Sequence, residues 1–165
     1  MTENFLIKPL TNAYSKEAIE LILPIQQIEF NVPITQEDQP DLLDIETCYF
    51  ASGGSFWGAF INDELVGTIA LMSTGHNACA LRKMFVKKEF RGKSLNIATH
   101  LLETLKEYCR EQNITDIYLG TVDILKAAHR FYERTGFSRI DQDNLPDYFP
   151  RMKADNVFYY LHLKN

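Results

Sequence analysis

The sequence predicts an α/β domain whose mixed central sheet carries helices on both faces, in the order β-α-α-β-β-β-α-β-α-β-β. Three observations lead to this fold class. Residues 52–86 have the pattern of consecutive strands joined by short turns. Residues 98–109 repeat apolar side chains at helical spacings of three and four. Residues 117–122 form a nearly continuous apolar strand, as is usual where both faces of a strand are covered.

The N-terminal part of the chain predicts one strand and two helices. Apolar residues within the segment 5–10 indicate the opening strand. Ser15 is placed to be the N-cap of a helix that breaks or bends at Pro24 and continues beyond it. A second, short helix is expected to begin near Thr35 or Asp38 and to run through the apolar residues up to position 45.

The middle of the chain predicts a β-hairpin and a third strand. Residues 55–61 and 65–71 are apolar runs that flank Asn62-Asp63-Glu64, which is typical of a hairpin. A turn at Gly75-His76-Asn77 then leads into a strand at about residues 80–86. These three strands are expected to be neighbours in one sheet.

The C-terminal half predicts two helices and three strands. The clearest helix covers residues 94–112 and ends near Asn113. A strand at 117–122 and a helix at 124–135 follow. The chain closes with strands in the segments 137–140 and 157–161. The apolar stripe of the first of these helices consists of Ala98, Leu101, Leu102, Leu105 and Cys109.

The composition is that of one globular domain of 165 residues, long enough to bury its own core. The N-terminus has no basic segment followed by an apolar run, and the most apolar early segment, residues 18–25, is interrupted by a glutamate and a proline. We therefore expect a cytoplasmic protein without a membrane segment. The three cysteines are far apart and odd in number, which favours reduced thiols over disulfides or zinc ligands. The histidines also lack metal-ligand spacing, so no metal is expected.

Positive charge is concentrated in one stretch of this acidic chain. The net charge is −5, but residues 82–93 carry +5 and the remainder −10. Such a cluster raises the local concentration of an anionic ligand. The alternative is a solvated strand end and turn. No second basic stripe accompanies the cluster, so nucleic-acid binding is not expected.

The cluster contains Gly92-Lys93-Ser94, which has the form of the end of a P-loop. The full motif requires a glycine where this sequence has Lys87, so the sequence argues against a triphosphate-binding protein. What remains is a glycine turn directly before a helix. Free N–H groups and the helix dipole make such a helix start an anion site. Gly92 allows a close backbone approach there, and Ser94 is suited to cap the helix.

Two motifs resemble the GNAT acyltransferases, a family that uses acetyl-coenzyme A. Residues 85–96, FVKKEFRGKSLN, are similar to the pattern Arg/Gln-x-x-Gly-x-Gly/Ala within its longer form, apolar-Val-x-x-x-x-Arg-Gly-x-Gly-apolar-Gly/Ala. Ser94 and Asn96 occupy the last two glycine-class positions. Residues 128–137, AHRFYERTGF, resemble Asn-x-x-Ala-x-x-Phe-Tyr-x-x-x-Gly-Phe, with Leu125 where the family has asparagine. The element order is also similar to the GNAT fold, with its mostly antiparallel sheet, so the resemblance covers nearly the whole chain.

The resemblance implies a cofactor site between two strands that splay apart, here 80–86 and 117–122. The pantetheine arm would bond to the backbone of residues 84–86 like an added strand. Gly120 is consistent with a bulge or a close backbone approach in the second strand. The cofactor-binding residues implied are Met84, Phe85, Val86, Arg91, Gly92, Lys93, Ser94, Leu95, Asn96, Leu125, His129 and Tyr132. For His129 the alternative is a surface histidine without a role.

The implied chemistry is direct attack of an amine on a thioester. Because a thioester is already activated, orientation supplies most of the acceleration, and no covalent enzyme intermediate is needed. Family analogy makes Tyr132 the general acid that protonates the departing thiolate, and the alternative is a core aromatic on a helix stripe. As general base we nominate Glu29, with Asp123 as second choice. Carboxylates near the first two helices favour a cationic amine as the acceptor. The alternative is that these carboxylates only increase the solubility of the helix starts and interact favourably with the helix dipole.

The tail at residues 145–152, LPDYFPRM, resembles a bacterial subgroup of the family and is expected either to cover the acceptor pocket or to edge the sheet. The sequence thus predicts an N-acetyltransferase that moves an acetyl group from acetyl-coenzyme A to a primary amine of a small molecule, cationic by this reasoning, or of a peptide. The alternative is a non-catalytic acyl-CoA-binding regulatory module, favoured by Ser94, Asn96 and Leu125. The sequence is compatible with a monomer or a homodimer.

Overall fold

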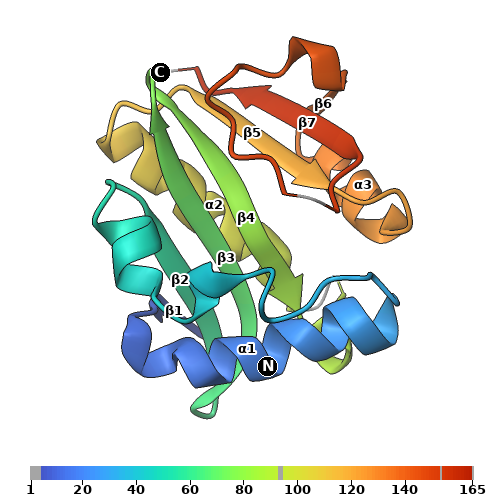
Figure 1. Cartoon of the computed structure of the whole chain (residues 1–165). Coiled ribbons are helices and arrows are strands. Elements are labelled where there is room, and N and C mark those ends of the chain that lie inside the picture. The colour runs from blue at the N-terminus through green and yellow to red at the C-terminus, as the bar shows by residue number, and fades with distance from the viewer. Residues whose placement is uncertain (1–4, 93–94, 153, 165) are drawn as a thin grey trace.

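The computed structural model describes residues 5–92, 95–152 and 154–164. These residues form a seven-stranded sheet in the order β1-β2-β3-β4-β5-β7-β6 (Figure 1). Neighbouring strands are antiparallel except β4 and β5, which are parallel, so the predicted mixed sheet is confirmed. The strands are β1 (Leu6–Pro9), β2 (Ser55–Ile61), β3 (Glu64–Gly75), β4 (Ala78–Val86), β5 (Asp116–Thr121), β6 (Ser138–Ile140) and β7 (Val157–His162).

The hairpin of β2 and β3 agrees with the prediction. The turn residues Asn62 and Asp63 have φ angles of 50° and 67°. Two successive residues with positive φ form the tight turn whose twist suits two antiparallel strands. Every residue of β2 is buried, which explains why this strand has a continuous apolar sequence instead of an alternating one.

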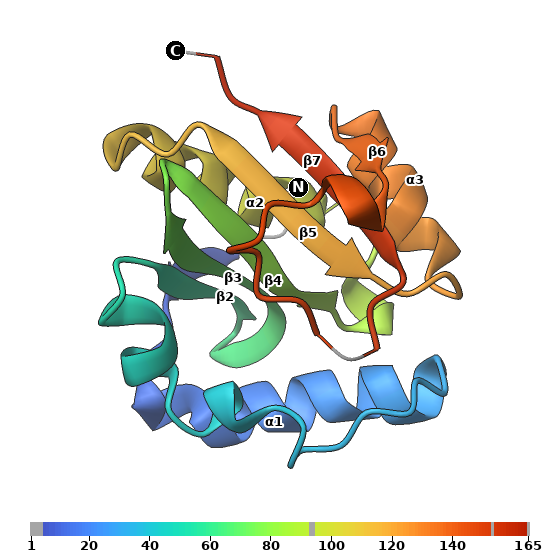
Figure 2. The same cartoon turned by 45° about the horizontal axis from the view of Figure 1, so that its top comes forward.

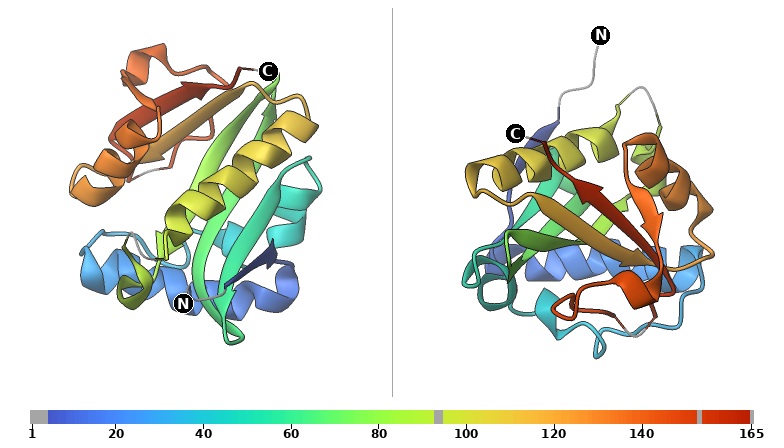
Figure 3. Two further views of the ribbon diagram at one scale, coloured as in Figure 1. Left: turned by 180° about the vertical axis from the view of Figure 1, so that it is seen from behind. Right: turned by 90° about the horizontal axis from the view of Figure 1, so that it is seen from above.

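Helices cover both faces of the sheet, as predicted. Helix α1 (Ser15–Pro24) lies on the face toward the viewer in Figure 1, and α2 (Ile97–Glu111) lies on the other face, seen from behind in Figure 3. Each helix turns an apolar stripe to the sheet, which produces two cores. The stripe of α2 consists of Ile97, Leu101, Leu102, Leu105 and Cys109.

The start of the first helix differs from the prediction. Thr11 caps a 3-10 turn (Asn12–Tyr14), so Ser15 is the first residue of α1 and the N-cap prediction for it was wrong. The chain also does not break at Pro24. Instead, α1 passes directly into a π-helical turn (Ile25–Glu29). Proline lacks an N–H and crowds the preceding turn, and the wider π-helical spacing accommodates it without ending the helix.

The second predicted helix is replaced by two short turns. Thr35 donates its backbone N–H and its hydroxyl to the Asp38 carboxylate, both at 3.0 Å, and no regular helix follows this local turn. A 3-10 turn (Pro40–Leu42) and a π-helical turn (Glu46–Phe50) follow. Both turns pack apolar side chains into the core beneath α1. Side chains that favour local hydrogen bonds to the backbone explain why the helix does not form where it was expected.

The C-terminal half places the last strand inside the sheet. β7 lies between β5 and β6, and α3 (Lys126–Arg134) connects β5 to β6 (Figure 2). Helix α3 is shorter than predicted and ends before Gly136, whose φ of 104° suits a helix C-terminus. In the described part of the chain, no helix combines the length and the apolar character that crossing a membrane requires.

Candidate active site

β4 and β5 lie side by side only at their beginnings. Their parallel pairing joins Ala78–Ala80 of β4 to Asp116–Tyr118 of β5. Beyond these residues the two strands diverge (Figure 1). β4 keeps its pairing with β3 up to Val86, and β5 keeps its pairing with β7 up to Thr121. This is the splayed strand pair that the family resemblance implied.

A β-bulge bends β4 beside this divergence. Lys83 has a φ of 53°, and the pairing with β3 slips there, because Thr68 faces Phe85 while Ala70 faces Arg82. The Thr68 hydroxyl donates to the Lys83 carbonyl at 2.7 Å, which satisfies a group that the bulge removes from the ladder. The bulge lets the consecutive side chains of Arg82 and Lys83 line one cavity.

The larger of two cavities at this place has a volume of about 330 Å³. It is enclosed by the end of β4, the loop after it, the first turn of α2 and helix α3. Its walls are mainly apolar with a few polar groups, as is usual for a ligand site. Of the cofactor-binding residues named from the sequence, it brings together Met84, Phe85, Val86, Arg91, Gly92, Asn96, Leu125 and Tyr132.

The loop before α2 has the backbone of an anion site. Gly92 has a φ of 124°, and Asn96 has a φ of 56° at the N-cap of α2. Glycine and asparagine tolerate this left-handed region, so Asn96 can replace a glycine-class residue without strain. Residues 97–99 of the first helical turn line the cavity, and first-turn N–H groups have no acceptor within their own helix. Leu95 packs against the core instead, and Lys93 and Ser94 lie outside the described residues.

The basic cluster of the sequence does not form one patch. Lys87 donates to Glu64 at 2.7 Å, and Lys83 turns into the protein at the bulge. Arg82 lines the second cavity. Among the basic residues from 82 to 92, Arg91 is the one that lines the larger cavity. Basic residues that are close together in the sequence are thus distributed between two cavities, because the bulge changes where their side chains point.

Arg91 links the end of β4 to the π-helical turn that follows α1. Its Nε donates to the Val86 carbonyl at 2.7 Å, and its two terminal nitrogens donate to both carboxylate oxygens of Glu29 at 2.5 and 2.7 Å. The hydrogen bonds from Arg91 lower the pKa of Glu29. A carboxylate held in this way is a weak proton acceptor. The geometry therefore does not support Glu29 as the general base.

Tyr132 combines the two readings that the sequence left open. Its ring is buried and packs edge-on against Phe131 and Phe137, so it is a core aromatic. The same residue lines the larger cavity. Burial, followed by the charge of Asp155 and by Tyr159, raises the pKa of its hydroxyl. The hydroxyl therefore keeps its proton at neutral pH and is able to donate it.

Two other residues named from the sequence do not reach either cavity. His129 is buried, not on the surface, and its Nε2 lies 2.9 Å from the Val122 carbonyl. Its polar group is thus used within the fold, which does not support contact with a cofactor. Asp123, the second choice for the base, is exposed after β5 and lines neither cavity. Leu125, in contrast, lines both.

A second cavity, of about 110 Å³, shares part of its lining with the larger cavity. Arg82 and Lys83 of β4, Gly120 of β5 and Asp155 of the C-terminal loop contribute to its lining. The tail segment contributes as well, through Phe149, Pro150 and Met152. Its aromatic and proline residues are therefore a wall of this cavity. Sequence reasoning missed Arg82 and Asp155 as site residues, and the only local signal was Gly120.

Gly120 makes room for Asp155. A Cβ atom at Gly120 would lie 2.4 Å from Oδ2 of Asp155. The predicted close approach is thus real, but β5 keeps an unbroken register with β7, so the predicted alternative of a bulge at this position was wrong. Burial raises the pKa of the Asp155 carboxyl to about 6, while Arg82 and Lys83 act to lower it. Asp155 is an acceptor of moderate strength at neutral pH.

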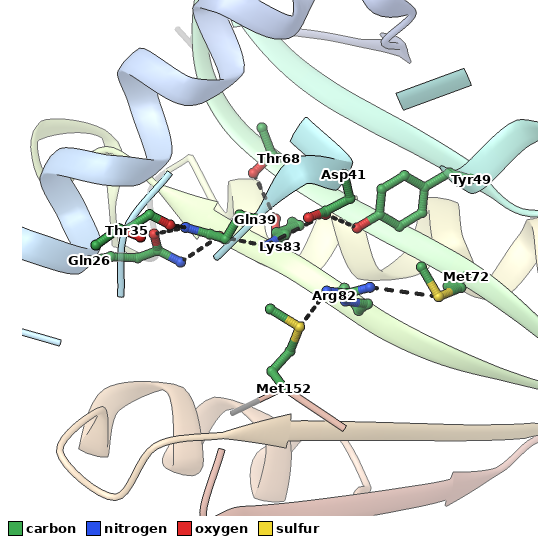
Figure 4. A network of polar contacts seen from close by, with 10 residues as sticks. All are labelled: Gln26, Thr35, Gln39, Asp41, Tyr49, Thr68, Met72, Arg82, Lys83 and Met152. Carbon is green, nitrogen blue, oxygen red and sulfur yellow. Dashed lines mark hydrogen bonds and ion pairs between the residues drawn. The ribbon is translucent and has the colours of Figure 1, made fainter. Parts of the chain in front are cut away.

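Lys83, which lines the second cavity, forms a buried ion pair with Asp41 (Figure 4). Their closest atoms are 3.6 Å apart, and both side chains are less than one-tenth exposed. Lys83 also donates to Gln39 at 2.5 Å, and Tyr49 donates to Asp41 at 2.5 Å. Burial lowers the pKa of Lys83 to about 8. These contacts join the segment before β2 to the bulge of β4.

The acidic residues that favoured a cationic acceptor are largely used within the fold. Glu29 is paired with Arg91, and Asp41 with Lys83. Asp44 accepts from the side chain of Asn12 at 3.0 Å. Asp38 and Glu46 also accept hydrogen bonds from neighbouring backbone groups. This part of the structure therefore gives no support to the expectation of a cationic amine.

Comparisons with known proteins identify the family of this chain. The family model described as the acetyltransferase (GNAT) family matches residues 19–137. The N-acetylaspartate synthetase of Danio rerio is 38% identical over 104 residues, which cover 62% of this chain and 36% of that protein. The chain thus spans about a third of the length of this curated relative.

Two solved structures are similar over almost the whole chain. The GNAT-family acetyltransferase of Staphylococcus aureus Mu50 is 46% identical with a TM-score of 0.94, covering 98% of this chain and 100% of that one. An acetyltransferase of Streptococcus agalactiae 2603 is 31% identical with a TM-score of 0.91, covering 96% and 98% of the two chains. The family model covers most of the chain, and the chain belongs to the GNAT acetyltransferase family.

Proposed function

We propose that the protein is an N-acetyltransferase that moves an acetyl group from acetyl-coenzyme A to the primary amine of a small molecule or peptide. One observation carries this proposal: a single cavity extends from the first turn of α2 to Tyr132. The helix start would bind the diphosphate, and the Tyr132 hydroxyl would protonate the departing thiolate. In acetyl-coenzyme A these two groups lie at opposite ends of the pantetheine arm. Family membership supports acetyl-coenzyme A as the donor. The relative from Danio rerio, an N-acetylaspartate synthetase, supports an amine as the acceptor.

The chain offers a distinct contact for each part of the cofactor. The N–H groups of residues 97–99 and the dipole of α2 would hold the diphosphate, and Gly92 lets the backbone come close. Residues 84–86 line the cavity, and their backbone would bond to the pantetheine arm. Leu125 offers only an apolar contact where the family pattern has an asparagine.

The reaction then needs orientation and two proton transfers. The amine nitrogen attacks the carbonyl carbon of the thioester, and the carbon–sulfur bond breaks. Tyr132 donates its proton to the sulfur, since its raised pKa keeps the hydroxyl protonated. A base removes one proton from the amine nitrogen. Acetylated amine and free coenzyme A thiol leave the enzyme.

Calorimetry with acetyl-coenzyme A, followed by a thiol-release assay on a panel of amines, tests the proposal. We expect saturable binding and acceptor-dependent release of thiol. If acetyl-coenzyme A produces neither heat nor protection against thermal unfolding, the proposed function is excluded.

The same assay separates the alternative of a non-catalytic acyl-CoA-binding regulatory module. Leu125 is the observation that favours it, because a contact expected in the family is missing. Saturable binding of acetyl-coenzyme A without thiol release on any amine would support that alternative. A Leu125→Asn variant provides a control, since restoring the amide should strengthen binding of coenzyme A in either case.

A further inference from the structure

Arg82 lies at the second cavity without an anionic partner. Its guanidinium nitrogens lie 3.6 Å from the sulfur of Met72 and 2.6 Å from that of Met152 (Figure 4). Thioether sulfurs are weak acceptors, whereas a guanidinium group carries five N–H donors. Among residues 5–92, 95–152 and 154–164, no carboxylate lies within ion-pair distance of Arg82. This half-buried cation therefore keeps most of its hydrogen-bonding capacity for a ligand.

Lys83, the next residue along β4, differs from Arg82 because it has an anionic partner. Lys83 is paired with Asp41 and donates to Gln39, so its charge is neutralised within the protein. The contrast identifies Arg82 as the group in this cavity that is free to bind an anion. Arginine binds carboxylates through two parallel hydrogen bonds, which favours a carboxylate ligand.

Asp155 supplies the opposite charge in the same cavity. It forms no ion pair with any residue in the part of the chain that the structure describes. Gly120 leaves the space that its carboxylate occupies. The lining of this cavity of about 110 Å³ thus includes a cation and an anion that form no ion pair within the described residues, although Arg82 and the Met152 backbone act on the Asp155 carboxyl. A free amino acid carries the complementary pair of charges within one small molecule.

The position of the second cavity suits an acceptor. Phe30, Phe85 and Leu125 line both cavities, so the two are neighbours with common walls. An amino group bound next to Asp155 would lie beside the cavity that holds the thioester. A carboxylate on Arg82 would orient the same molecule from its other end.

We propose that the second cavity binds a free amino acid as the acetyl acceptor, with its carboxylate on Arg82 and its amino group next to Asp155. This inference rests on the proposed acetyl transfer. The amino group loses one proton to solvent before attack. Its nitrogen then forms the bond to the acetyl carbon as the carbon–sulfur bond breaks. Asp155 accepts the remaining amine proton, Tyr132 protonates the sulfur, and both residues exchange protons with solvent afterwards.

Matched acceptors test the role of Arg82. Amino acids and their carboxamides, such as alanine and alaninamide, both carry an α-amino group and differ in the carboxylate. Because the amide has the more acidic amine, kcat/KM is expressed per concentration of neutral amine. We expect kcat/KM for the acid to exceed that for the amide by about 100-fold, because the two parallel hydrogen bonds of arginine to a carboxylate each contribute about 10-fold. Arg82→Gln should lower the value for the acid about 100-fold and leave the amide unchanged, with Arg82→Lys in between. Arg130→Gln, an exposed residue of α3, is the control.

Equal use of acids and amides by the wild type, or an equal loss for both in Arg82→Gln, would overturn the inference while leaving acetyl transfer intact. If no amine is acetylated, the proposed function fails separately. Binding of the amino acid panel by calorimetry then decides: binding to the wild type that Arg82→Gln abolishes supports the inference, and binding that the substitution does not change overturns it.

The pH dependence tests Asp155. The groups that act on its carboxyl are the Met152 backbone, Arg82 and Lys83 of β4 and Arg151 of its own loop, and Tyr132 of α3 is a further neighbour. Deprotonation of the amino acid raises kcat/KM with pH in every variant. We expect an additional rise around pH 6 in the wild type, and Asp155→Asn to lower kcat/KM and to remove this additional rise. An additional rise that persists unchanged in Asp155→Asn would overturn the role of Asp155.

Discussion

Arg91 donates two hydrogen bonds to the carboxylate of Glu29, at 2.5 and 2.7 Å, and thereby ties the loop before α2 to the π-helical end of the first helix. Arg91 also lines the larger cavity. It is therefore placed both to order the loop and to present positive charge to a diphosphate. These two roles predict different responses to charge reversal.

We predict that Arg91→Glu weakens binding of coenzyme A by about 10-fold at low salt and by less at high salt, since exposed charges are screened. The double variant Glu29→Arg/Arg91→Glu restores the ion pair with exchanged partners. It should recover the thermal stability lost in Arg91→Glu but not the affinity for coenzyme A. Titration calorimetry at two salt concentrations measures the affinity for coenzyme A, and thermal unfolding measures the stability. Full recovery of affinity in the double variant would show that Arg91 only anchors the loop.

Tyr132→Phe should lower kcat by about 100-fold, the usual order for loss of a general acid. It should change the affinity for coenzyme A by less than about 2-fold, because the ring and its packing remain. Tyr108→Phe is a matched control, since its hydroxyl bonds to the Gly53 carbonyl at 2.8 Å and Tyr108 lines neither cavity. Thiol release and calorimetry provide the two readouts. An unchanged kcat in Tyr132→Phe would remove this residue from the acid role.

Most of the fold was predictable because its signals are local. The hairpin turn at Asn62-Asp63 and the stripe of α2 each follow from residues close in sequence. The misplaced elements are those in which tertiary contacts or unusual turns decide. Pro24 predicts a helix end by itself, but a π-helical turn continues the helix to Glu29. His129 has a polar side chain that predicts exposure, and its bond to the Val122 carbonyl explains its burial.

The candidate site was predictable on the cofactor side only. The loop at Gly92 and the tyrosine of α3 belong to motifs with fixed spacing, and the larger cavity contains both. The side proposed for the acceptor depends on the bulge at Lys83, which has no sequence signature and places Arg82 at the second cavity. It also depends on Asp155, which reaches Gly120 from a distant loop. Contacts of this kind are set by tertiary packing and not by a local pattern.

The buried pair of Lys83 and Asp41 predicts strong coupling. Asp41→Leu should lower the free energy of unfolding by about 3 kcal/mol, because Lys83 is left buried without its counter-charge. The double variant Asp41→Leu/Lys83→Met should be more stable than Asp41→Leu, since no isolated charge remains. The exposed pair of Arg110 and Glu107 is a control, and its removal should cost less than about 1 kcal/mol. Additive effects of the two core substitutions in urea unfolding would contradict the pairing.

Asp155 predicts a stability difference that depends on pH. Its pKa is raised from 3.8 to about 6, so the fold favours the neutral carboxyl. That contribution is present below pH 4 and is lost as the pH rises through about 6. Asp155→Asn should therefore match the wild type at pH 4 and exceed its free energy of unfolding at pH 8 by up to about 3 kcal/mol. Urea unfolding at both pH values, with Asp123→Asn as the exposed control, measures this difference. A difference independent of pH would exclude the linkage.

Gly120 predicts a direct energetic coupling to Asp155 across the second cavity. In Gly120→Ala the new methyl group would lie 2.4 Å from the Asp155 carboxylate, so either the side chain or its loop must move. We expect a loss of about 1 to 3 kcal/mol in the free energy of unfolding, as for other overpacked sites. In an Asp155→Ala background the same substitution should cost less, because the carboxylate that it displaces is absent. Urea unfolding of the four variants gives the coupling energy. Equal costs in both backgrounds would mean that Asp155 does not occupy the space beside Gly120, and the acceptor site would then lose its anion.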